Sequence, residues 1–155
     1  MVEFACARLR GGAVCAHYAR LCRPLGRIRR AAAATHGITE AMTADCPTFA
    51  ELLPSMLAFI GKDTVICHNA PFDMGFLKAY CARAGIDYSP RTADTLILAR
   101  RLFPGKVNHS LAAMAERLGV TAGTAHRALA DALTTAQVYV KLLQTQSERA
   151  AEGGA

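Results

Sequence analysis

The sequence predicts a single α/β domain in which a mixed sheet is flanked by helices. Two observations carry this prediction. Two extended runs stand side by side at the start of the chain, and amphipathic helices then alternate with short apolar segments. The 155 residues are enough to bury one hydrophobic core, and the sequence contains neither an internal repeat nor a linker that would divide it.

The first expected element is a β-hairpin. Residues 2–9 and 13–21 form two extended runs, and the Arg-Gly-Gly sequence between them is typical of a tight turn. Pro24 ends the second run. Residues 25–35 are then predicted to be a connecting loop.

Helices and short strands alternate through the rest of the chain. Thr48 and Glu51 form a capping box, which predicts an amphipathic helix that ends at Gly61. Phe72 and Phe76, together with Leu77 and Tyr80, indicate a second helix. The other expected elements are strands at 64–67 and 91–94 and helices at 95–103, 110–118 and about 127–143. The folded domain is therefore expected to span residues 1–143, and the polar residues 144–155 are expected to form a frayed tail.

Composition and charge exclude several classes of protein. Hydrophobic residues make up 52% of the chain, which excludes a disordered protein. No apolar run reaches the roughly 18–20 residues of a membrane helix. Charged residues precede any apolar run, so a signal peptide is not expected and the cytoplasm is the expected location. The net charge of +6 arises in residues 1–30, where seven arginines accompany one acid. This excess fits either a nucleic-acid-binding patch or a solvated arginine-rich edge.

The cysteines do not predict a metal site or a disulfide framework. No two of the six are spaced as in a zinc knuckle, and all are expected to be reduced thiols. Cys67 ends an apolar run and is expected to be a small buried hydrophobe.

Asp73 is the first candidate for chemistry. It follows a predicted buried strand and a sharp turn, and it lies in the first turn of the next helix. Ligands commonly bind at the carboxyl end of a strand in an open α/β sheet. An acid at a helix N-terminus also interacts favourably with the helix dipole, and the spacing alone favours this second interpretation.

His126 and Asp131 are the second candidates. Residues five apart on an ideal helix point about 140° away from each other. The two side chains can therefore converge only if His126 lies in the lead-in before the helix. In that case Asp131 could hold a metal ion while His126 acts as a general base. The alternative is a surface histidine and an exposed aspartate.

Four short segments together resemble the DEDDh 3′–5′ exonucleases. They are HGIT at 36–39, HNAPFD at 68–73, DTL at 94–96 and HRALADA at 126–132. Over about residues 2–143 the chain is similar to the proofreading epsilon-type subunits of bacterial DNA polymerase III. The resemblance implies a ribonuclease-H-like fold and the removal of nucleotides from a 3′ end.

The resemblance also assigns roles to individual residues. In this chemistry two divalent ions, Mg²⁺ or Mn²⁺, clamp the attacking water and the leaving oxygen. By motif, Asp73 and Asp131 are metal ligands and His126 is the general base. The resemblance also implies that the terminal nucleotide lies near His36, Asn69 and Phe72. Asp94 is interpreted as a helix N-cap rather than as a ligand.

The chain departs from the family pattern at its start. The family's first strand carries an Asp-X-Glu motif that supplies two further carboxylates, and Glu3 matches a glutamate of the second strand instead. We therefore expect the first central strand to be absent between the hairpin and residues 65–67. The two-metal site would then be incomplete and nuclease activity impaired.

Three functional interpretations remain open. The first is an exonuclease of DNA replication, with a DNA polymerase partner, whose start lies upstream of Met1. The second is a nucleic-acid-binding remnant without catalysis, and the third is an exonuclease that trims RNA. The Pro104-Gly105-Lys106 segment resembles the epsilon type and favours single-stranded DNA 3′ ends as substrate.

Overall fold

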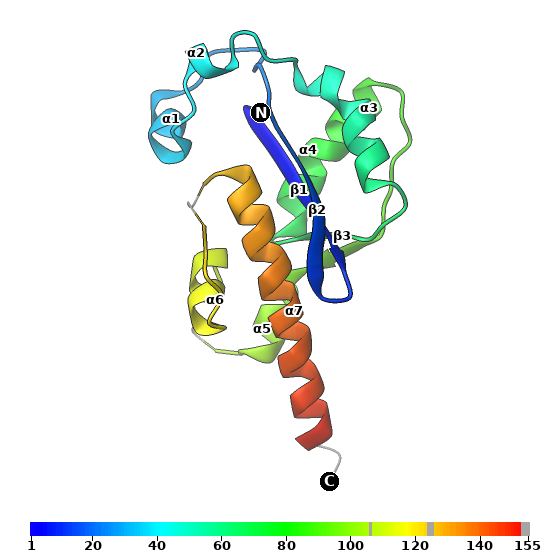
Figure 1. Cartoon of the computed structure of the whole chain (residues 1–155), viewed down its shortest axis with the longest axis vertical. Coiled ribbons are helices and arrows are strands. Elements are labelled where there is room, and N and C mark those ends of the chain that lie inside the picture. Colours follow the sequence, from blue (N-terminus) through cyan, green and yellow to red (C-terminus); the bar gives the residue numbers. More distant parts are fainter. Residues whose placement is uncertain (106, 124–125, 153–155) are drawn as a thin grey trace.

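The computed structural model describes residues 1–105, 107–123 and 126–152 (Figure 1). Lys106 of the epsilon-like segment and residues 153–155 of the expected tail lie outside the described residues. In chain order the elements are β1 (Glu3–Arg10), β2 (Ala13–Leu21), α1 (Arg30–His36), α2 (Glu40–Thr43), α3 (Phe49–Ile60), β3 (Val65–Cys67), α4 (Ala70–Arg83), β4 (Thr92–Asp94), α5 (Thr95–Leu102), α6 (Leu111–Arg117) and α7 (Ala128–Glu152). The predicted α/β class is thus confirmed.

The N-terminal hairpin is confirmed as predicted. Strands β1 and β2 pair antiparallel, with Glu3 opposite Leu21 at the open end. Gly11 and Gly12 form the turn with φ values of 56° and 81°. This left-handed backbone suits glycine, because glycine has no Cβ to clash with the neighbouring carbonyl group.

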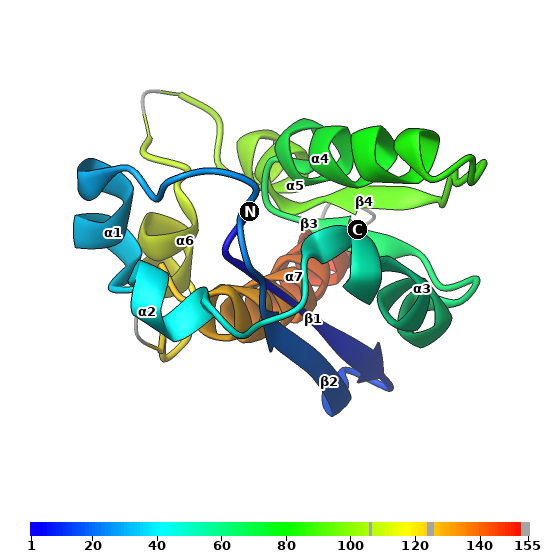
Figure 2. The same cartoon turned by 90° about the horizontal axis from the view of Figure 1, so that it is seen from above.

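The strands form two separate sheets. Strands β3 and β4 pair parallel to each other, and β1 pairs only with β2. Among the described residues, β1 and β3 therefore each keep one edge without a strand partner. Helix α7 packs against both β1 and β3, and Figure 2 shows it running across the space between the two sheets in that view. The expected gap at the place of a central strand is present.

Two hydrophobic clusters hold these elements together. The first joins the hairpin and β3 to α3 and α4, and its most buried members include Cys22, Leu53, Met56 and Cys81. The second joins α5, α6 and α7 through Ala99, Met114, Val138 and Leu142. Because α7 also contacts both sheets, it links the two clusters.

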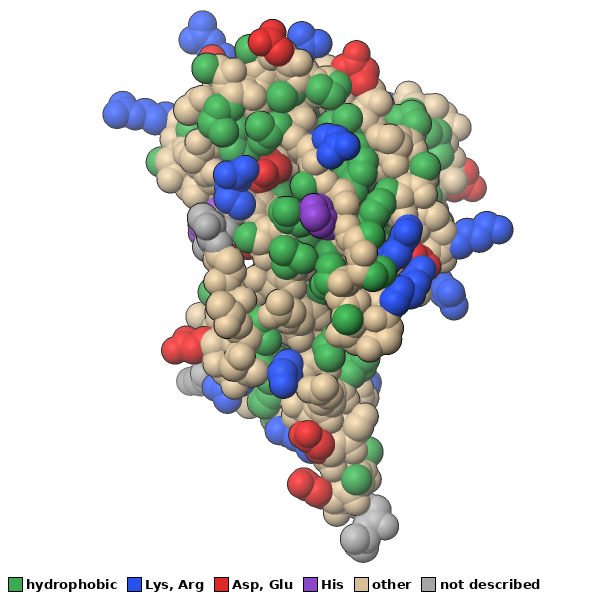
Figure 3. Space-filling model, viewed as in Figure 1, with side chains coloured by type: hydrophobic (Ala, Val, Ile, Leu, Met, Phe, Trp, Pro, Cys, Tyr) green, Lys and Arg blue, Asp and Glu red, His purple; other side chains and the backbone are tan. Residues whose placement is uncertain are grey.

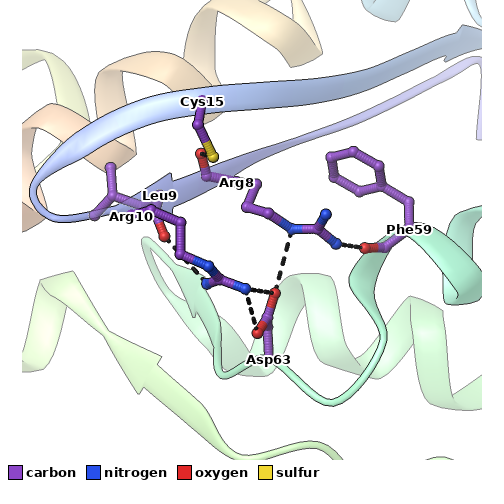
Figure 4. A network of polar contacts seen from close by, with 6 residues as sticks. All are labelled: Arg8, Leu9, Arg10, Cys15, Phe59 and Asp63. Carbon is purple, nitrogen blue, oxygen red and sulfur yellow. Dashed lines mark hydrogen bonds and ion pairs between the residues drawn. The ribbon is translucent and has the colours of Figure 1, made fainter.

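An ion-pair network ties β1 to the turn that precedes β3 (Figure 4). The Asp63 carboxylate accepts hydrogen bonds from Arg10 at 2.7 and 2.8 Å and lies 3.3 Å from Nε of Arg8. These contacts, the Arg10 hydrogen bonds foremost, hold the pKa of Asp63 below its usual value. Arg8 also donates to the Phe59 carbonyl group and lies 4.6 Å from the Phe59 ring centroid. Two of the seven N-terminal arginines therefore have a structural role.

Basic side chains do not form one stripe on the face that Figure 3 shows. There the lysine and arginine side chains lie at several separate places, with hydrophobic and polar surface between them. This distribution fits the solvated-edge interpretation better than a continuous nucleic-acid-binding patch on that face.

The predicted loop over residues 25–35 is wrong in its second half. Arg30–His36 forms helix α1. The cause is a run of four alanines, the strongest helix formers, followed by Gly37 in the left-handed conformation at φ 71°. Helix α2 was also not predicted.

The predicted frayed tail is wrong for residues 144–152. Helix α7 continues to Glu152. The extension contains good helix formers, and Arg149 donates to the Leu102 carbonyl group while lying 5.4 Å from the Phe103 ring centroid. This contact anchors the helix end to α5.

Two further predictions concern membranes and thiols. None of the described helices combines the length and the hydrophobicity needed to span a membrane. All six cysteines are free, and Cys67 is buried as expected. Burial raises the pKa of the Cys67 thiol to about 12, so this side chain stays a neutral hydrophobe.

Candidate functional site

Asp73 lies in the first turn of α4, directly after β3. Pro71 occupies the first turn and Asn69 the N-cap position. The pKa of Asp73 is raised, first because its carboxyl group is partly shielded from water and also because Asp94 repels its charge.

Asp94 organises the backbone at the start of α4. Its carboxylate accepts hydrogen bonds from the backbone N–H groups of Asn69 at 3.1 Å, Ala70 at 2.9 Å and Leu96 at 2.8 Å. Burial disfavours the charged form of Asp94, but these donors outweigh it and lower its pKa. The predicted N-cap of α5 is confirmed, and the same side chain also fixes the turn that carries Asp73.

His68, in the same motif, connects β3 to the following elements. Its Nδ1 lies 2.8 Å from Oγ1 of Thr95, and its Nε2 lies 2.8 Å from the carbonyl oxygen of His109. Burial lowers the pKa of His68, so the neutral form is favoured. Both ring nitrogens of His68 are therefore engaged in contacts that hold β3 to the following elements, whereas His126 is exposed.

His126 and Asp131 meet at the start of α7. His126 is exposed and lies in a turn two residues before the helix begins at Ala128. Its backbone N–H group donates to the Asp131 carboxylate. Burial raises the pKa of Asp131, against the opposing influence of His126. His126 therefore lies in the lead-in before the helix, which is the position that the two side chains need in order to converge.

Asn69 and His126 share an unusual backbone conformation. Among the described residues they are the two non-glycine residues with a left-handed φ, at 73° and 64°. Such a conformation costs of the order of 1–3 kcal/mol and concentrates at functional sites. One stands at the entry to the helix that carries Asp73, and the other at the entry to the helix that carries Asp131.

Glu3 has a positioning role that was not predicted from the sequence. Its carboxylate accepts hydrogen bonds from the Arg127 guanidinium at 2.9 Å and from the Ala128 backbone N–H group at 2.7 Å. It therefore caps α7 and fixes this helix to β1. The only sequence indication was that Glu3 is the sole acid in the arginine-rich first 30 residues.

The predicted site residues fall into two groups. His36 ends α1, accepts a hydrogen bond from the Ile38 N–H group at 3.0 Å, and is close enough to Glu3 to help lower the pKa of that carboxyl group. The first group is His36 and Asp131, whose charges interact with that of Glu3, with His126 beside Asp131. The second group is Asn69, Phe72 and Asp73 at the start of α4, close to Asp94.

The residues present do not by themselves fit a two-metal site. Over the part of the chain that the structure describes, no three histidine, cysteine, aspartate or glutamate side chains are grouped closely enough to hold a metal ion. Hard divalent cations need about six oxygen ligands. Asp73 and Asp131 therefore supply only part of the ligand set that the resemblance implies.

Glu3→Gln is expected to destabilise the fold by about 1–3 kcal/mol, because the ion pair is replaced by neutral hydrogen bonds beside Arg127. Burial of Glu3 raises its pKa, but the Arg127 and Ala128 hydrogen bonds outweigh burial and lower it. This contribution is therefore complete above pH 4.5, the ordinary value, and is lost as pH falls through the lowered pKa. Thermal unfolding of Glu3→Gln and of Glu116→Gln, an exposed control on α6, across pH 3–7 measures it. Equal stability of the two variants at pH 7 would contradict the assignment.

Comparison with known proteins identifies the family. The RNase_T exonuclease model matches residues 1–139. The chain belongs to the exonuclease family. It is 34% identical over 145 residues to the DNA polymerase III subunit epsilon of Aquifex aeolicus, covering 93% of this chain and 72% of that protein. It is also 32% identical to the PolC-type DNA polymerase III of Thermotoga maritima, of which it spans 10%.

Solved exonuclease structures share this fold. Exonuclease X, solved in complex with 5′ overhanging duplex DNA, superposes with a TM-score of 0.76 at 31% identity, covering 95% of this chain and 84% of that one. The nuclease domain of 3′hExo, a DEDDh family member bound to rAMP, has a TM-score of 0.79 at 19% identity, covering 92% of this chain and 80% of that one. The exonuclease domain therefore has a ribonuclease-H-like fold, with its first central strand absent from the sheet described above.

Proposed function

We propose that this exonuclease domain removes nucleotides from DNA 3′ ends, as an epsilon-type 3′–5′ exonuclease. The observation that carries the proposal is the placement of its three reactive side chains. Asp73 lies in the first turn of α4, His126 lies just before α7 and Asp131 lies in its first turn, and a non-glycine residue with a left-handed backbone stands at the entry to each helix. The similarity to epsilon and to a DNA-bound exonuclease supports DNA as the substrate.

We further propose that a strand carrying an Asp-X-Glu motif fits between β1 and β3. Each of these strands has an edge without a partner in the described part of the sheet, and α7 packs against both of them. Unpaired strand edges readily accept another strand. Such a strand would add two carboxylates to Asp73 and Asp131, and the resulting oxygen-rich ligand set suits Mg²⁺ or Mn²⁺.

In the proposed site the residues of this chain have distinct roles. His126 accepts a proton from the attacking water, while Asp131 and Asp73 complete the acidic site. His36, Asn69 and Phe72 lie near the terminal nucleotide and orient it. Glu3 and Asp94 touch no reacting group in this scheme, but they hold the entries to α7 and α4 in place.

The direction of degradation tests the proposal. With the Asp-X-Glu strand present, a single-stranded oligonucleotide labelled at its 5′ end should shorten one nucleotide at a time. The same DNA labelled at its 3′ end should release labelled mononucleotide at once. Release of labelled mononucleotide from the 5′ end would contradict the proposed polarity. Faster trimming of a matched RNA would favour the exoribonuclease instead.

A second candidate function is nucleic-acid binding without catalysis. It is favoured by one observation, that the described residues contain no group of three metal-ligand side chains. It predicts that the strand-completed protein, which is this chain with the Asp-X-Glu strand added, binds single-stranded DNA but does not shorten it in Mg²⁺.

The similarity to epsilon also leads us to propose a DNA polymerase as a partner in the cell.

A further inference from the structure

Phe72 and Phe76 form an exposed aromatic pair on α4. Their side chains are 63% and 45% exposed, whereas the other four phenylalanines of the chain are buried or half-buried. Their ring centroids lie 5.3 Å apart with an interplanar angle of 71°. Leaving two such rings largely exposed to water forgoes the stabilisation that their burial would provide.

The position of the pair relates it to the candidate site. The buried face of α4 is formed by other side chains, namely Ala70, Met74, Leu77 and Cys81. Phe72 and Phe76 stand one helical turn apart on the exposed side, and Asp73 lies between them in the sequence. A group bound against both rings is thus held directly beside the Asp73 carboxylate.

The chemistry of the pair favours unpaired nucleobases as its occupant. Aromatic side chains next to a nucleic-acid path bind bases by stacking, and this binding tolerates any base because each has a π-face. A protein partner that covered both rings would also cover Asp73 and block the candidate site. Bases stacked on the rings would leave the strand end free to reach Asp73.

We propose that Phe76 is a second stacking platform, which holds the base next to the terminal one while Phe72 holds the terminal base. The inference rests on the proposed function and extends it to the form of the substrate. Successive nucleotides of a strand are spaced by about 3.4 Å when stacked and farther when splayed. Two rings 5.3 Å apart can therefore contact two neighbouring bases. The exonuclease domain should accordingly require at least two unpaired nucleotides at the 3′ end.

Binding of labelled oligonucleotides to the 155-residue chain tests the proposal without requiring catalysis. Phe76→Leu should weaken binding of a single-stranded oligonucleotide by roughly 5- to 100-fold, and Phe76→Tyr should retain it, because stacking needs an aromatic ring. Leu25→Ala, which removes an apolar side chain that is 82% exposed, is the matched control and should bind like the unsubstituted chain. Circular dichroism and thermal unfolding verify that each variant is folded.

An abasic substitution separates stacking from a structural role. Removing the penultimate base should weaken binding to the unsubstituted chain but not weaken binding to Phe76→Leu any further. If Phe76→Leu binds as tightly as Leu25→Ala, or if the two losses simply add, the proposed platform is wrong. That result would leave the 3′–5′ activity intact. Conversely, the strand-completed protein could fail to shorten DNA while Phe76→Leu still weakens DNA binding as expected. That result would reject the 3′–5′ activity and support the stacking platform.

Discussion

Asp131→Ala is expected to abolish nucleotide removal at every pH in the strand-completed protein. The half-buried Asp131 carboxylate lies at the start of α7 beside His126. In the proposed site its loss removes one of the few acidic ligands for divalent ions. A bound metal ion contributes several kcal/mol to such reactions, so the rate should fall by about 10⁴-fold or more. Asp73→Ala should behave in the same way.

Single-turnover cleavage and calorimetric Mn²⁺ titration measure this effect. Both aspartate variants should bind Mn²⁺ more weakly than the unsubstituted protein. Asp45→Ala is the control, because it removes an exposed carboxylate that belongs to neither group. An Asp131→Ala protein that retains a tenth of the normal rate would contradict the role assigned to this residue.

Loss of the His126 imidazole is expected to cost about 10²–10⁴-fold in rate, the usual contribution of a general base. The residual activity should rise with pH, because hydroxide replaces the missing base. Mn²⁺ affinity should be retained. These three outcomes together distinguish a proton acceptor from a metal ligand.

The backbone conformation of His126 decides which substitution to use. At φ 64° an alanine is strained, whereas glycine adopts this conformation freely. His126→Gly therefore removes the imidazole and keeps the turn that places the backbone N–H group on Asp131. Comparison with His126→Ala shows how much of the loss comes from the backbone. If His126→Gly loses Mn²⁺ affinity as strongly as Asp131→Ala, His126 is a ligand instead.

Elements with strong local rules could be predicted from the sequence. The capping box of Thr48 and Glu51 and the stop at Gly61 define α3 as observed, because both act within one helical turn. The Gly-Gly turn defines the hairpin in the same way. The gap between β1 and β3 was predicted only through the family resemblance, since no local pattern in this chain describes an absent strand.

Elements that depend on distant contacts could not be predicted. The last turns of α7 are anchored by Arg149 on Phe103, two residues 46 positions apart in the sequence. The exposure of Phe72 and Phe76 likewise depends on which side of α4 faces the core. Apolar side chains in a helix pattern do not reveal this when other apolar residues line the opposite face.

The sequence identified candidate site residues but not the contacts that hold them in place. Asp73, His126 and Asp131 were identified by motif, and the structure places each at a helix entry. The contacts that hold these entries join residues far apart in the sequence. Glu3 reaches Arg127 and Ala128, and Asp94 reaches Asn69. No spacing rule within one element could reveal such pairs.

The proposed need for a central Asp-X-Glu strand is tested most directly by comparing DNA shortening with and without that strand. The 155-residue chain alone should show little or no Mg²⁺-dependent shortening of a 5′-labelled single-stranded oligonucleotide. The same chain preceded by an added strand that carries an Asp-X-Glu motif should degrade the DNA. The control with that motif changed to Asn-X-Gln should remain inactive. Robust degradation by the 155-residue chain itself would contradict the claim that Asp73 and Asp131 form only part of the site.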